Sequence, residues 1–147
     1  MPAVSTRFDR MVPAAPGSIG PLRRQLRAFA RRHGASGRVQ AAVALAFSEA
    51  CAVVVRASDC REAEPPPLIV EASVRDAELH VRVAHQGRAV TLASDLSGYG
   101  FGLALISRVA DSFEVARRDD GPGTALTMVF SLERSRARAS SAPGPRD

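Results

Sequence analysis

Apolar side chains recur at helical spacing in two segments of the first third of the chain. The first segment predicts an amphipathic helix over residues 19–33, capped by Ser18 and covered with arginines on its other faces. Its apolar positions are Ile19, Leu22, Leu26 and Phe29. Residues 38–57 are apolar around most of the helical circumference, which predicts a second helix that is buried on more than one side.

Alternating apolar and polar residues replace the helical period after three consecutive prolines. The alternation predicts strands over 68–74 and 79–83 with a turn at 75–78, then a glycine-rich loop, a helix over 103–110, and strands over 112–117 and 124–132. Residues 7–12 form a weak candidate strand, whose arrangement the sequence leaves undecided. This order predicts an α+β, two-layer sandwich in which the helices cover one face of a mainly antiparallel sheet.

The length of 147 residues and a hydrophobic content of 46% favour one globular domain, which we place over residues 7–132. The remaining residues, 133–147, mix Arg, Ala, Ser, Pro and Gly without periodicity and are expected to form a disordered tail. No apolar run approaches the length of about 20 residues that a membrane helix needs, and the N-terminus does not have the order of a signal peptide. We therefore expect a cytoplasmic protein. Cys51 and Cys60 lack metal-ligand spacing and are expected to be reduced thiols.

The positive charge lies mainly in the first quarter of the chain. All 20 basic residues are arginines, and residues 1–40 hold eight of them against one acid, Asp9. Such a surface favours an anionic partner, and the charge by itself leaves nucleic acid, membrane and acidic protein open. The predicted partner-binding residues are four arginines of the first helix: Arg23, Arg24, Arg27 and Arg31.

Two features of the sequence suggest a chemical site. Gly98, Gly100 and Gly102 alternate just before a predicted helix, where backbone N–H groups can approach a phosphate, although a flexible loop also uses glycine in this way. The chain has no Lys, so this is not a Walker loop. Glu49 is the only acid of the second helix, and it marks either a site or a helix edge that meets water or an arginine.

Two further candidates flank predicted strands. His85 ends the second strand of the hairpin, where a histidine is usually solvated or capping and less often a ligand or an acid–base group. Thr124 follows Gly123 at the start of the last strand. A Gly-Thr pair is common where a hairpin turn leads into a strand, but the Thr124 hydroxyl could also reach a phosphate.

Four sequence elements occur together in a characteristic order, roughly within residues 7–132. They are Phe47-Ser48-Glu49-Ala50, the strand end His85-Gln86-Gly87, the glycine run 98–102 followed by Leu103-Ala104-Leu105-Ile106, and Gly121-Pro122-Gly123-Thr124. The order resembles the anti-sigma regulatory factor family, the serine-kinase branch of the histidine kinase-like (GHKL) ATPases. The resemblance implies a Bergerat-type sandwich that binds ATP, forms homodimers and holds a sigma factor until it engages an anti-anti-sigma protein, whose serine it can phosphorylate.

The resemblance also implies roles for individual residues. Glu49 matches the general base, while Gly98, Gly100 and Gly102 match glycines of the lid over the phosphates. The remaining matches lie around the nucleotide: Gly87 is kept, Ala89 replaces a second glycine, Thr124 matches a threonine near the adenine, and His85 stands where the family has the aspartate that accepts a hydrogen bond from the adenine.

One departure concerns the metal. The family has an Asn that binds Mg²⁺ one helical turn after the glutamate, and Val53 stands there in a chain without any Asn. Mg²⁺ therefore loses a protein ligand, and ATP binding is expected to be weakened. The expected function is an anti-sigma-like regulator of transcription, and the alternative is an active ATP-dependent serine kinase that uses Glu49. A nucleic-acid binder is a third hypothesis, although the chain has no Trp and only one Tyr.

Overall fold

The computed structural model describes residues 5–57, 67–85, 100–118 and 123–132. The elements follow in the order β1 (Arg7–Pro13), α1 (Pro16–Arg32), α2 (Gly37–Ala57), β2 (Pro67–Arg75), β3 (Glu78–His85), α3 (Gly100–Val109), β4 (Ser112–Arg117) and β5 (Thr124–Ser131). The predicted tail over 133–147 lies outside the described residues. The helices and strands lie at or near the residue ranges that the periodicity of the sequence predicts.

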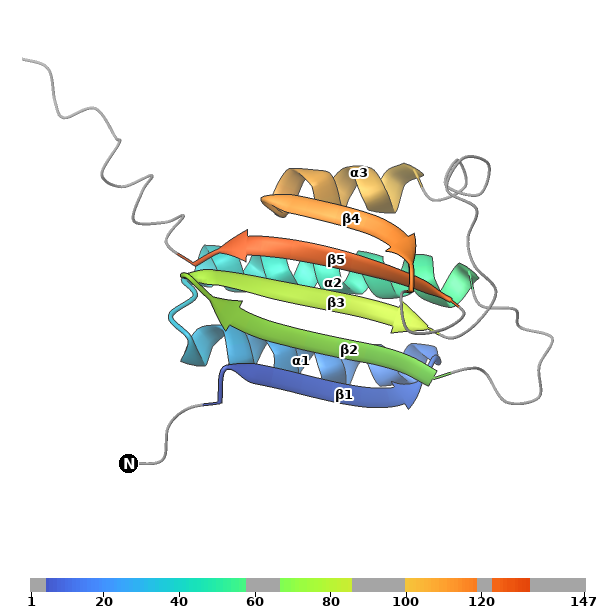
Figure 1. Ribbon diagram of the computed structural model, residues 1–147, viewed down its shortest axis with the longest axis horizontal. Helices are drawn as coiled ribbons and strands as arrows, with labels where there is room; N and C mark the ends of the chain where they lie inside the picture. Colours follow the sequence, from blue (N-terminus) through green and yellow to red (C-terminus); the bar gives the residue numbers. More distant parts are fainter. Residues whose placement is uncertain (1–4, 58–66, 86–99, 119–122, 133–147) are drawn as a thin grey trace, which may run out of the picture.

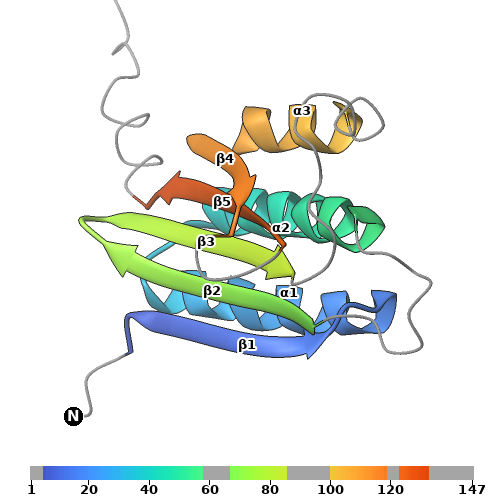
Figure 2. The ribbon, with the colours of Figure 1, turned by 45° about the vertical axis from the view of Figure 1, so that its right-hand side comes forward.

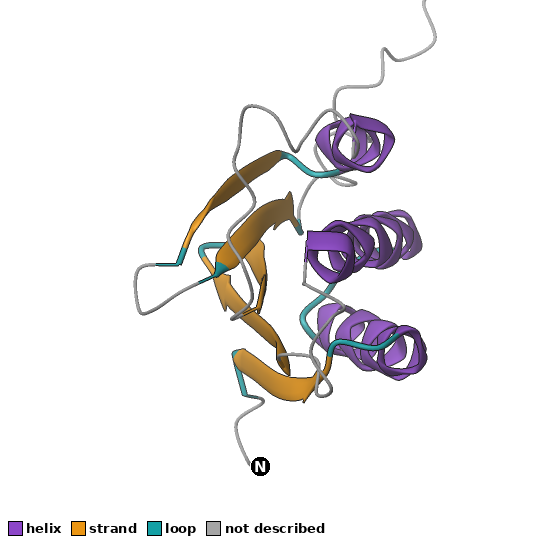
Figure 3. Cartoon of the chain, turned by 90° about the vertical axis from the view of Figure 1, so that its right-hand side faces the viewer, coloured by secondary structure: helices purple, strands orange, loops and turns teal. Residues whose placement is uncertain are grey.

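The five strands form one open sheet in the order β1-β2-β3-β5-β4, in which every neighbouring pair is antiparallel (Figure 1). Figure 3 shows the three helices side by side in one layer on a single face of this sheet. The prediction of an α+β sandwich is confirmed. The open question about the first strand is also answered, because β1 pairs with β2 along its whole length.

The core lies between the sheet and the helix layer. Apolar residues alternate along the strands, so that Leu68, Val70, Val81 and Leu126 are fully buried, and they face the helices. The hairpin turn between β2 and β3 places Asp76 and Ala77 at φ values of 51° and 59°. Positive φ at both central residues is the geometry that matches the twist of the flanking strands, so the predicted turn is confirmed.

The start of α1 differs from the prediction. The helix begins at Pro16 rather than at residue 19, and its N-cap is Ala15, which makes no side-chain capping bond, so Ser18 is not the cap. Proline explains the earlier start, because its fixed φ suits the first helical position and its missing N–H would have had no partner there. The predicted end at His33-Gly34 is confirmed: Gly34 has a φ of 94°.

The central helix, α2, packs against α1 on one side and α3 on the other (Figure 2). By length and composition alone its residues Gly37–Val54 could cross a membrane, which corrects the expectation that no segment of the chain would pass that test. In the fold these residues supply the core instead. Val43, Ala46, Phe47 and Ala50 are fully buried against the sheet and the neighbouring helices.

The third helix starts inside the glycine run. α3 begins at Gly100, so Gly100 and Gly102 belong to its first turn and not to the loop that the sequence predicted. This difference matters for the site, because the first turn of a helix carries N–H groups that have no partner within the helix.

Candidate functional site

Several of the predicted site residues lie at the same end of the molecule. This end, on the right in Figure 1, is where β3 finishes, where β5 and α3 begin, and where the C-terminal half of α2 runs. The antiparallel order produces this meeting, since β3 runs toward the end from which β5 departs. Gly87, Ala89 and Gly98 lie outside the described residues.

Glu49 and Gly102 meet where α2 packs on α3. A β-carbon added at Gly102 would lie 3.2 Å from Glu49 Oε2 and 3.5 Å from Val53 Cγ2. A side chain at position 102 would therefore crowd the carboxylate, so the glycine allows the first turn of α3 to approach α2 this closely. The Glu49 side chain is half-buried beside α3, and among the described residues no arginine forms a salt bridge with it.

Val53 occupies the position at which the resemblance implies an Asn that binds Mg²⁺. Val53 follows Glu49 by four residues, so both side chains lie on the same side of α2, and Val53 is 5% exposed. A valine side chain has no atom that can ligate a metal. In the described parts of the chain, no three His, Cys, Asp or Glu side chains gather into a possible metal site. Val53 therefore supplies no ligand to a Mg²⁺ ion beside Glu49.

Ser48 connects the neighbourhood of Glu49 to the first helix. Arg23 Nη1 donates a hydrogen bond to Ser48 Oγ at 3.1 Å, and Ser48 Oγ donates to the Ala44 carbonyl at 2.9 Å. Arg23, predicted as a partner-binding residue, therefore also fastens α1 to α2 one residue before the carboxylate. The sequence carried no signal of this contact.

His85 and Thr124 form a second pair at this end of the sheet. They are directly opposite each other on β3 and β5, and Thr124 is also opposite Arg117 on β4. His85 is fully buried and Thr124 is 4% exposed, so the reading of His85 as a solvated residue is wrong. Its place at the end of a strand, with the side chain on the helix-covered face, explains the burial.

The surroundings of His85 favour its neutral form. Burial lowers the pKa of His85 below its ordinary value of 6.5, and the positive charge of Arg118 lowers it further. Arg118 lies just after β4 and is held there by a hydrogen bond from its backbone N–H to the Gly123 carbonyl at 3.0 Å. Sequence reasoning missed Arg118; the only available signal was its place beside the turn that leads into Thr124.

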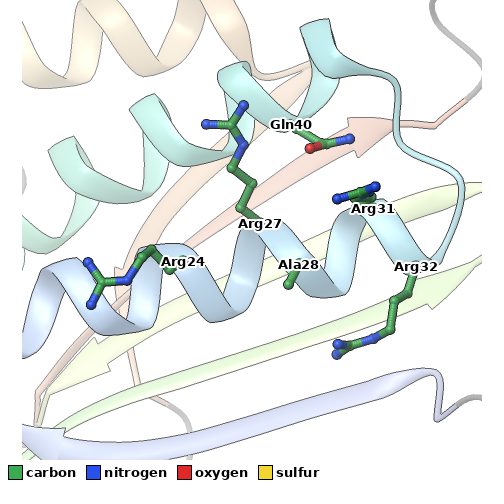
Figure 4. A pocket seen from close by; sticks show the side chains of 6 residues that line it. All are labelled: Arg24, Arg27, Ala28, Arg31, Arg32 and Gln40. Atoms are coloured by element: carbon green, nitrogen blue, oxygen red, sulfur yellow. The ribbon is translucent and has the colours of Figure 1, made fainter.

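The arginines of α1 lie on a different part of the surface. Arg24, Arg27 and Arg31 line an open groove of about 500 Å³ together with Arg32, Ala28 and Gln40 (Figure 4). Sequence analysis predicted Arg24, Arg27 and Arg31 as partner-binding residues. It missed two further residues that line the groove, Arg32 and Gln40, of which Gln40 comes from α2. Arg23 is not part of this lining, because its side chain turns toward Ser48.

A family model described as the histidine kinase-like ATPase domain matches residues 12–130, which is most of the chain. The chain belongs to this family. Its GHKL fold, in which nucleotide binding is the general property of the ATPase domain, agrees with the sandwich and with the glycine-bearing first turn of α3. The resemblance drawn from the sequence is thereby confirmed at the level of the superfamily.

Two of the solved structures that share the fold show how far the similarity extends. A crystal structure of the RsbU and RsbW domains of Rv1364c from Mycobacterium tuberculosis is similar with a TM-score of 0.68 and 19% identity, over 87% of this chain and 32% of that one. The histidine kinase domain of the blue-light activated histidine kinase from Erythrobacter litoralis EL346 is similar with a TM-score of 0.59 and 15% identity, over 97% of this chain and 71% of that one. This chain thus spans about a third of the first of these proteins. No curated protein matches it.

Proposed function

We propose that this chain is an anti-sigma-like regulator of transcription that binds a sigma factor, an anti-anti-sigma protein, or both, and that binds ATP weakly. The family and the order of motifs supply the class of domain. The observation that carries the proposal is the combination at α2 and α3: Glu49 lies against Gly102, while the neighbouring position for a metal ligand is Val53. Relative to the family pattern, the chain keeps the acid Glu49 but has no metal ligand at position 53. This combination favours binding of a partner over phosphoryl transfer.

The residues at this end of the sheet support a weak nucleotide site. The first turn of α3 offers backbone N–H groups to phosphate oxygens, and Thr124 has a hydroxyl beside His85. A neutral His85 has one nitrogen that donates and one that accepts a hydrogen bond, so it can bond to the edge of the adenine. It lacks the negative charge and the two acceptor oxygens of a carboxylate. Each unmatched polar contact costs about 1 to 3 kcal/mol, enough to lower ATP affinity markedly.

The regulator would act through its protein partner. In this proposal the arginines of α1 engage an acidic surface of the partner, the chain works as a homodimer, and it works in the cytoplasm. The charge distribution supports the first point, because α1 carries five arginines and no acid. Light scattering of the purified protein, which distinguishes a monomer from a dimer by mass, tests the second.

Calorimetry with ATP and ADP, each with and without Mg²⁺, tests the nucleotide part of the proposal. We expect weak heats that Mg²⁺ does not strengthen, because Val53 cannot ligate the ion. Tight binding that requires Mg²⁺ would contradict this. For the partner, each sigma factor and anti-anti-sigma protein of the host is titrated individually against the protein; if none of them binds, the regulator proposal is wrong.

An active serine kinase is the second candidate, and the position of Glu49 beside the first turn of α3 favours it. In this reading the Glu49 carboxylate accepts the proton of a serine hydroxyl as that oxygen attacks the terminal phosphorus of ATP and ADP departs. Incubation with radiolabelled ATP and an anti-anti-sigma protein should then label serine, and Glu49→Ala should abolish the label. Label that persists in Glu49→Ala would exclude Glu49 as the base.

A further inference from the structure

A row of guanidinium groups follows one side of α1. Arg24, Arg27 and Arg31 are three and four residues apart, which places about one arginine on each turn of the same helix face. Figure 4 shows them along α1 with Arg32, around the exposed Ala28. None of the described residues that line the groove is acidic. The row therefore presents regularly spaced positive charge over a length of about 10 Å.

An apolar stripe of α2 borders this row. Gln40 lines the same groove, and its Nε2 is fixed by a hydrogen bond to the Ala35 carbonyl at 3.0 Å. Ala41 and Leu45 follow it on the outward side of α2, and Leu45 is 41% exposed. Ser48, one turn further along, accepts the hydrogen bond from Arg23 of α1. Gln40 and Ser48 thus flank the apolar pair Ala41 and Leu45, and each of the two lies beside arginines of α1. We call the arginine row together with Ala41 and Leu45 the seam.

We infer that this seam is the docking site for an amphipathic helix of a partner protein, with carboxylates along one flank and apolar side chains along its centre. The inference rests on the proposed function, because it takes the ligand of the regulator to be a protein. A helix laid along α1 presents carboxylates at the spacing of i, i+3 and i+7, which matches the arginine row. Leu45 and the adjacent alanines cover its apolar centre. A polyphosphate would use the arginines but would gain nothing from the apolar stripe.

A designed peptide tests the seam directly. The probe is a peptide about 18 residues long, or about five turns, with Glu on one flank, Leu along the centre and one Trp. The protein contains no Trp, so the fluorescence of the peptide reports binding without background. The control peptide has the same composition in an order that mixes Glu and Leu on every face.

Matched pairs of variants separate the seam from the net charge. Arg27→Glu/Arg31→Glu reverses two charges in the groove, while Arg7→Glu/Arg75→Glu reverses two exposed charges on β1 and β2. Leu45→Ser removes the apolar contact of the seam. Its control, Met11→Ser, changes a side chain that is 66% exposed on β1.

The designed peptide should bind the native chain and the two sheet variants about equally. We expect Arg27→Glu/Arg31→Glu to weaken binding by about tenfold or more, and Leu45→Ser to weaken it several-fold. Equal binding of the mixed peptide, or an equal loss in the sheet variants, would overturn the inference. Tighter binding of a DNA duplex that the same groove variants abolish would also overturn it, in favour of nucleic acid. If a full-length sigma factor or anti-anti-sigma protein binds the groove variants normally, the inference fails while the proposed function stands.

Discussion

Glu49 and Gly102 meet across the interface of α2 and α3, where a β-carbon on Gly102 would lie only 3.2 Å from Glu49 Oε2. This distance is shorter than ordinary contact between a carbon and an oxygen, so one of the two groups would have to move. The carboxylate is half-buried and sits at the end of a flexible side chain. The pair therefore links the conformation of the acid to the absence of a side chain on α3.

Gly102→Ala should displace the Glu49 carboxylate without unfolding the protein. Replacing a glycine inside a helix by alanine raises the free energy of unfolding by about 0.5 to 1 kcal/mol, and crowding at Glu49 should offset this gain. Gly20→Ala in α1 is the matched control, because among the described residues its β-carbon would have one neighbour within 4 Å, Arg24 Nη1 at 3.8 Å. Urea unfolding should show that Gly20→Ala stabilises the protein and that Gly102→Ala does so less or not at all. In a Glu49→Ala background the two substitutions should become equivalent; an unchanged difference would contradict the contact.

Val53→Asn should make nucleotide binding respond to Mg²⁺. The amide would stand four residues after Glu49, on the same side of α2 and facing α3. A largely buried amide at this position should lower the free energy of unfolding by about 1 to 3 kcal/mol, so the variant is to be tested well below its melting temperature. Calorimetry should show ATP heats that grow with Mg²⁺ in Val53→Asn but not in Val53→Ala, which only makes room. The same Mg²⁺ response in both variants would refute a ligand role for this position.

His85 should make the protein less stable in mild acid. Because its pKa in the folded state is lowered, the unfolded chain takes up the proton first as the pH falls through 6.5, so the free energy of unfolding decreases below that pH. His85→Gln should flatten the decrease between about pH 7 and 5. Arg118→Met should also reduce it, by removing the charge that lowers the pKa of His85.

His80→Gln is the control for the acid experiment, because His80 lies on the same strand but is only partly buried. Denaturant unfolding at a series of pH values supplies the free energies. A decrease of the same size in His85→Gln and in the native chain would show that other groups cause it.

Cys51 should be inert in the folded protein. Its side chain is fully buried in α2, and burial raises the pKa of the thiol to about 12. Because the thiolate is the reactive form, a Cys60→Ser variant should react with a thiol reagent at pH 8 only as fast as it unfolds. The reaction should become fast in denaturant. Above pH 9 the unfolded chain ionises first, so stability should fall as the pH rises toward 12. Rapid labelling of the native variant would contradict the burial.

The sequence by itself determined the elements of this fold and the chemistry available to it. Periods of 3.6 and 2 residues report the backbone conformation and the buried side of each element, so the hairpin of β2 and β3 and the helix α2 were predictable. The order of four motifs along the chain, from Glu49 through the glycine run to Thr124, was sufficient to indicate the histidine kinase-like superfamily. The missing Asn was likewise visible from composition alone.

The tertiary structure alone decided which of these residues meet. The contact of Glu49 with Gly102 depends on how closely α3 packs on α2, and the burial of His85 depends on the layer of helices over the sheet. The same holds for Arg23, which turns to Ser48 while its neighbours on α1 line a groove that Gln40 completes. A periodic pattern specifies one face of one element, whereas a site is made by side chains from several elements, whose separation only packing determines.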